Sequence, residues 1–121
     1  MSRNILDAAH IHPAALAKIN ANHRELVAEV QAAVAANNVV VVGMGLNPFP
    51  AKARKILDGN GTAYHYLGYG NYFSQWRPRL ALKLWSGWST FPIIFVKGTL
   101  IGGADDLQKL IDSGEFARMV A

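Results

Sequence analysis

Hydrophobic and polar positions follow two spacings along this chain, one typical of helices and one typical of strands. Within residues 23–36, apolar side chains recur at three- and four-residue intervals, which predicts an amphipathic helix. The four valines at 39–42 are continuous and β-branched, so they predict a strand covered on both faces. Asn47 then stands at a helix N-cap position with Pro48 as the first helical residue, and that helix is expected to end near the Gly- and Asn-containing residues 58–61.

The second half of the chain continues this alternation of strands and helices. The expected elements are a strand at 62–67, a helix from a cap at Ser74 to about Trp85, strands at 93–96 and 99–101 joined by a tight hairpin, and a last helix at 104–111 followed by a short tail. The strands at 39–42 and 62–67 flank a helix, so they should be parallel. This order predicts one layered α/β structure.

The first residues stand apart from this pattern. His12 and Pro13 can start a helix, which the polar stretch 20–22 interrupts. We therefore expect an N-terminal helical extension, residues 1–22, and a main domain, residues 23–121.

Composition narrows the classes of function. Hydrophobic residues make up 51% of the chain and charged residues 17%, which suits a packed core. There is no run of about 18 apolar residues and no signal-like start, so we expect a cytoplasmic protein without membrane contact. The chain has no cysteine, which excludes disulfides, thiol catalysis and cysteine-held metal centres within it. The basic residues and the four histidines are scattered, so neither nucleic acid nor a metal site is expected.

Two motifs in the main domain resemble those of a known family. Residues 88–92 (Trp-Ser-Thr-Phe-Pro) and 102–105 (Gly-Gly-Ala-Asp) are similar, in sequence and in separation, to the Trp-Pro-Thr-Phe-Pro and Gly-Gly-Cys-Asp segments of the monothiol glutaredoxins. Residues 47–50 (Asn-Pro-Phe-Pro) stand where that family has Cys-Pro-Tyr-Cys or Cys-Gly-Phe-Ser. The resemblance covers about residues 23–116. It implies an α/β thioredoxin-like fold, with a four-stranded mixed sheet flanked by helices. It also implies a family chemistry in which glutathione reduces disulfides and the monothiol branch carries iron–sulfur clusters.

The resemblance further implies a glutathione-type groove. In that groove Pro92 is a cis proline, the Phe91 backbone pairs with the cysteinyl part of glutathione, and Asp105 with the Ala104 backbone holds the γ-glutamyl end. Arg79 meets the glycine carboxylate. The site residues carried over are Arg79, Thr90, Phe91, Pro92, Ala104 and Asp105, and the groove lining adds Leu46, Asn47 and Phe49.

Three positions depart from the family pattern. Asn47 replaces the nucleophilic cysteine, Pro50 takes the second position of the same motif, and Met44 replaces a lysine that helps to bind glutathione. Thiol–disulfide exchange requires a thiolate, which an amide cannot replace. Pro50 also removes an N–H group near a helix start, which weakens the site for an anion. We therefore predict no catalytic residue, and weakened glutathione binding.

The residues assigned to the groove can also have purely structural roles, and the sequence does not decide between these roles and ligand binding. Asn47 is most simply a helix cap, and Phe91 with Pro92 can serve to brace its loop. The negative charge of Asp105 stabilises the N-terminus of the last helix whether or not the residue also holds a ligand. Arg79 can be a solvated charge on its helix.

Three functions follow from these alternatives. The first is a binding or regulatory module with a residual groove, for which glutathione is the candidate ligand. The second is a protein-interaction adaptor or homodimer that uses the N-terminal helix and the tryptophan-rich surface. The third is a residual glutathione-dependent oxidoreductase. The sequence does not decide between a monomer and a homodimer, or between glutathione and a peptide or protein partner.

Overall fold

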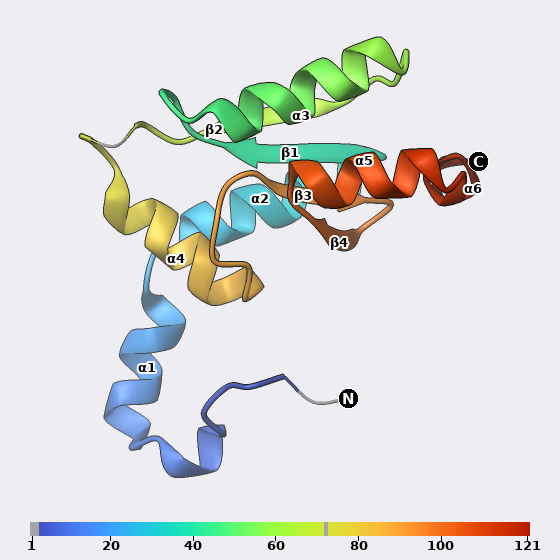
Figure 1. Cartoon of the computed structure of the whole chain (residues 1–121). Helices are drawn as coiled ribbons and strands as arrows, with labels where there is room; N and C mark the ends of the chain where they lie inside the picture. The colour runs from blue at the N-terminus through green and yellow to red at the C-terminus, as the bar shows by residue number, and fades with distance from the viewer. Residues whose placement is uncertain (1–2, 72) are drawn as a thin grey trace.

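One mixed sheet organises the molecule. We describe a computed structural model that covers residues 3–71 and 73–121. The strands follow the order β2-β1-β3-β4, in which β1 and β2 are parallel and the other neighbours are antiparallel. Their bounds are β1 Val39–Gly43, β2 His65–Gly68, β3 Ile93–Val96 and β4 Thr99–Gly102. The predicted four-stranded sheet and its parallel pair are confirmed (Figure 1).

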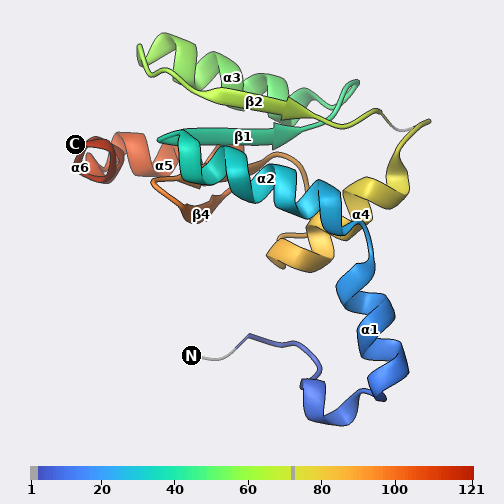
Figure 2. The same ribbon diagram turned by 180° about the vertical axis from the view of Figure 1, so that it is seen from behind.

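Helices cover both faces of this sheet because successive side chains of β1 point to opposite sides. Val40 and Val42 pack with Val30 of α2 and Leu82 of α4. The view from behind shows α2 lying beside β1 on this face (Figure 2). Val39 and Val41 belong to the opposite cluster, formed with the helices α3, α5 and α6. The bounds are α2 Arg24–Ala36, α3 Pro48–Gly59, α4 Trp76–Ser86, α5 Ala104–Asp112 and α6 Glu115–Val120.

The N-terminal residues form a helical arm beside the domain. A short 3-10 turn, Ala8–His10, is followed by α1, Pro13–Ala21, which begins at His12 and Pro13 as predicted, with His12 as its N-cap. No residue of α1 is buried, and both overall views show it projecting from the side of the sheet that carries α2 and α4 (Figures 1 and 2). Arg3 reaches back to Gly87 at the end of α4, where a Cβ atom would collide with the guanidinium. The division at residues 22 and 23 stays a prediction.

Three predicted details were wrong. Ser74 does not cap α4, because Gln75 stands at the N-cap in a left-handed conformation without a side-chain cap bond. The second strand is shorter and later than 62–67, since ladder pairing with β1 begins only at His65. The expected tail contains α6, which buries Phe116 to 2% exposure in the core. Across the described residues, no helix is long and apolar enough to cross a membrane.

Candidate functional site

A cavity of about 310 Å³ lies where three segments of the domain meet. Phe49 at the start of α3 forms one wall, and the loop before β3 forms the second with Trp88 and residues 90–92. The third wall is the start of α5, residues 103–106. The peptide bond between Phe91 and Pro92 is cis, as the resemblance implied. The cavity thus brings together five of the six predicted site residues, which are Thr90, Phe91, Pro92, Ala104 and Asp105.

Leu46 and Asn47, which were expected in the groove lining, are not among the residues that line this cavity. Asn47 instead serves the local fold. Its Oδ1 accepts a hydrogen bond from the Phe49 N–H at 3.0 Å, and Pro48 follows as the first residue of α3. This confirms the predicted cap, which satisfies one of the free N–H groups of the helix start. The side chain that replaces the family's nucleophile is therefore used to begin the helix.

Pro50 and Met44 are both part of the apolar core. Pro50 is buried in the first turn of α3. A Cβ atom on Gly43 would lie 2.8 Å from the Pro50 Cβ and 2.9 Å from the Tyr66 ring, so only glycine allows the strand to approach this closely. Met44 is 6% exposed within the cluster under α2 and α4. Neither position supplies a polar group to the cavity.

Arg79 is buried away from the cavity. Its side chain is 6% exposed, and Nη1 donates hydrogen bonds to the carbonyl oxygens of Tyr69, at 3.0 Å, and Ser74. The alternative of a solvated helix charge was therefore wrong. Arg79 is also absent from the cavity lining, so its contact with a ligand carboxylate stays a prediction.

Arg79 belongs to a polar network that fixes the loop between β2 and α4. The Tyr69 hydroxyl donates a 2.6 Å hydrogen bond to Oε1 of Glu29 on α2. Burial, followed by this bond and the Glu29 charge, raises the pKa of Tyr69. The sequence offered no signal for this network, because its members lie in three separate segments.

Asp105 and Asp106 have different roles in the first turn of α5. The Asp105 carboxylate pairs with Lys52 of α3, with Nζ 2.8 Å from Oδ1. The hydrogen bond from Lys52, together with its charge, lowers the pKa of Asp105. Asp106 was missed by the sequence reasoning, although it lies three residues after Gly103 at capping-box spacing. Its Oδ2 accepts the Gly103 N–H at 2.9 Å and so closes the helix start.

Trp88 lines the cavity and carries a buried polar atom. Among the described residues, its indole Nε1 is buried and has no hydrogen-bond partner. Buried N–H groups usually have a partner, so in the described part of the chain this donor is left unsatisfied beside the cavity. In residues 3–71 and 73–121, no group of three or more His, Asp and Glu side chains is placed to hold a metal ion.

The sequence and the structure were compared with those of known proteins. The chain is 46% identical over 96 residues to the glutaredoxin-like protein of Dictyostelium discoideum, a match that covers 79% of this chain and 78% of that one. The chain belongs to the glutaredoxin family. It is also 30% identical over 96 residues to the probable monothiol glutaredoxin 2 of Rickettsia typhi, of which the match covers 84%. No protein-family model matches the chain.

Further matches are either short in sequence or visible mainly in the three-dimensional structure. The match to human glutaredoxin-3 is 33% identical over 68 residues and spans 19% of that protein. Among solved structures, oxidised glutaredoxin 2 from Chlamydomonas reinhardtii superposes with a TM-score of 0.69 at 26% identity, over 80% of this chain and 92% of that one. A buckwheat glutaredoxin–glutathione complex gives a TM-score of 0.68 at 23% identity, over 80% and 88%. The thioredoxin-like fold is thereby established. The cysteine on which the family's chemistry depends is absent from this chain.

Proposed function

We propose that this protein is a glutaredoxin homologue that binds a ligand in the cavity beside cis-Pro92 without exchanging thiols and disulfides. One observation carries the proposal. The cavity is formed by Phe49, the 90–92 loop and the start of α5, while the position of the nucleophile holds Asn47, whose side-chain oxygen caps α3. The cavity and the reactive group are thus separate features, and only the cavity is present.

Glutathione is the ligand that the family resemblance supports best. The buckwheat homologue was solved as a glutathione complex, and the cavity walls here include Phe91 and the α5 start, which the resemblance assigns to such a ligand. Binding should be weak for two reasons. Met44 leaves an apolar side chain where the family has a lysine, and the Asp105 carboxylate is already paired with Lys52.

Calorimetry with reduced glutathione tests the proposal. The wild-type protein should release or absorb heat at millimolar ligand. Thr90→Trp should abolish this signal, because Thr90 is exposed at the cavity and the larger side chain would fill it. Thr99→Trp is the matched control, since Thr99 is also exposed but lies in the hairpin strand β4, outside the cavity lining. No binding heat at millimolar glutathione would rule the proposal out for this ligand.

The absence of catalysis has its own test. The chain should reduce a glutathionylated disulfide substrate no faster than buffer alone, because no residue can form the thiolate that attacks sulfur. Turnover at the rate of an ordinary glutaredoxin would favour the residual oxidoreductase instead.

A further inference from the structure

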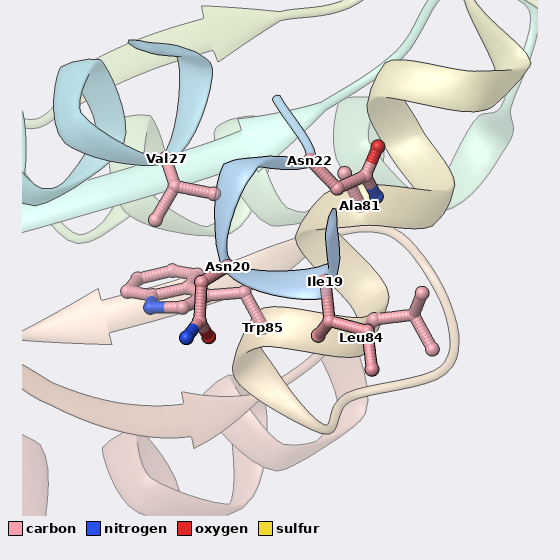
Figure 3. A pocket seen from close by; sticks show the side chains of 7 residues that line it. All are labelled: Ile19, Asn20, Asn22, Val27, Ala81, Leu84 and Trp85. Carbon is pink, nitrogen blue, oxygen red and sulfur yellow. The ribbon is translucent and has the colours of Figure 1, made fainter. Parts of the chain in front are cut away.

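A second cavity, of about 240 Å³, lies between the N-terminal arm and the domain. Its walls include Ile19 from α1, Val27 from α2 and Ala81, Leu84 and Trp85 from α4 (Figure 3). The close-up shows Ile19 and Leu84 next to each other at its edge. It shares no lining residue with the cavity beside Pro92.

An exposed apolar stripe runs from this cavity along α4. Trp76, Leu80 and Leu84 follow each other at four-residue spacing, so they lie on one face of the helix. They are 58%, 44% and 67% exposed, and the neighbouring Ile19 is 56% exposed. Large apolar side chains gathered on one face commonly mark a protein-interaction site. We call this surface, formed by Ile19, Trp76, Leu80 and Leu84, the α4 stripe.

The charges around the stripe are mainly positive. Neither α1 nor α4 contains an Asp or Glu, whereas Lys18 and Arg77 are exposed on them. Lys83 of α4 lies over the Phe91 ring instead. The start of α2 adds one charge of each sign, Arg24 and Glu25, which leaves the balance positive. A second copy of this chain would place cations against cations, which opposes a homodimer through this face.

We propose that the α4 stripe docks an acidic amphipathic helix of a partner protein. Such a helix would lay apolar side chains at three- and four-residue spacing against Leu80 and Leu84, with an anchor entering the cavity beside Trp85. Its flanking carboxylates would face Lys18 and Arg77. Trp76 and Leu84, the outer α4 positions of the stripe, are eight residue steps apart, or roughly 12 Å of helix at the usual rise, which matches about two turns of a bound helix. This site is independent of glutathione binding.

Fluorescence anisotropy with designed peptides tests the proposal on the full chain. The probe is a labelled 18-residue helix with leucines along one face and glutamates on the flanks, and the comparison peptide carries lysines in place of the glutamates. The acidic peptide should bind and the basic one should not, with affinity falling as salt rises. Equal binding of the two peptides, or none, would overturn the proposal.

Two sets of variants locate the binding. Leu84→Gln should lower the affinity for the acidic peptide by about tenfold or more, since the burial of a leucine side chain is lost. Leu6→Gln is the matched control, because Leu6 is 68% exposed and Leu84 67%. The pair Lys18→Glu with Arg77→Glu should make the chain prefer the basic peptide. If Leu84→Gln binds as the wild type does, or if sedimentation shows a dimer that Leu84→Gln dissociates, the proposed occupant is wrong.

Discussion

Lys52 of α3 and Asp105 of α5 form an ion pair that joins the starts of two helices, with the Lys52 Nζ 2.8 Å from the Asp105 Oδ1. Both side chains are largely exposed, at 50% and 73%, so the pair adds little to stability. The pair matters because of where it lies, at the wall of the cavity beside Pro92. Asp105 lines the cavity beside Pro92, and any ammonium group of a ligand must compete there with the protein's own lysine.

The first prediction concerns the charge of Asp105. Its pKa is lowered from the ordinary value of 3.8 by Lys52, so the carboxylate stays ionised and the pair persists as the pH falls below that value. The pair is lost only when the pH passes the lowered pKa. In a titration followed by NMR, Lys52→Ala should raise the midpoint of Asp105 toward 3.8. Lys55→Ala, on the same helix, should leave it unchanged. An unaltered midpoint in Lys52→Ala would refute the pairing in solution.

The second prediction concerns Arg79. Arg79→Met should lower the free energy of unfolding by about 2–3 kcal/mol, because the carbonyls of Tyr69 and Ser74 lose a charged donor inside the protein. Arg77→Met changes an exposed residue of the same helix and should remain within about 0.5 kcal/mol of the wild type. Urea denaturation measures both. Equal effects of the two substitutions would contradict the buried role of Arg79.

A third prediction separates the cap at Asn47 from a binding role. Asn47→Ala should cost about 1 kcal/mol of stability, since the Phe49 N–H loses its acceptor. Asn47→Asp keeps an acceptor at the helix start and should cost little. Thermal unfolding distinguishes the variants. Equal stability of Asn47→Ala and the wild type would show that the cap contributes nothing.

The fourth prediction restores a sulfur at the same place. Asn47→Cys puts a thiol at the N-terminus of α3, where the helix dipole lowers a thiol pKa and raises its reactivity at neutral pH. This variant should gain measurable glutathione-dependent disulfide reduction over the wild type. Recovery should be partial, because Met44 and Pro50 remain apolar and buried. Asn60→Cys, at the other end of α3, is the control and should gain none.

Local sequence signals predicted the elements whose residues specify them directly. The valines of β1 are β-branched and contiguous, and Asn47 with Pro48 combines a side-chain acceptor with a preset backbone angle. By contrast, Ser74 carried the expected cap chemistry, yet the helix begins after Gln75, whose φ is 56°. Helix-cap preference favours Ser74, but Ser74 belongs to the preceding turn: its N–H donates to the Asn71 carbonyl, and its own carbonyl accepts from Arg79 Nη1.

The parts that were missed depend on tertiary contacts. The segment of α6 is short, and its helix is stabilised by burial of Phe116 against the sheet rather than by its own periodicity. The pairing of Lys52 with Asp105 joins residues 53 positions apart, which no local pattern reveals. Five of the six predicted site residues line the cavity beside Pro92, because the family motifs carry them. Arg79 does not, since its side chain is held by carbonyls of the loop after β2. Leu46 and Asn47, which were expected in the groove lining, are also absent from it.

The central claim is that the cavity beside Pro92 still binds a glutathione-type ligand, although the family's nucleophilic cysteine is replaced by Asn47. The most direct measurement is the map of amide chemical-shift changes in the full-length ¹⁵N-labelled protein as reduced glutathione is added to millimolar concentration. The account predicts changes concentrated at residues 90–91 and 103–105, and their disappearance in Thr90→Trp. An unchanged spectrum, or changes located only around α1 and α4, would contradict it.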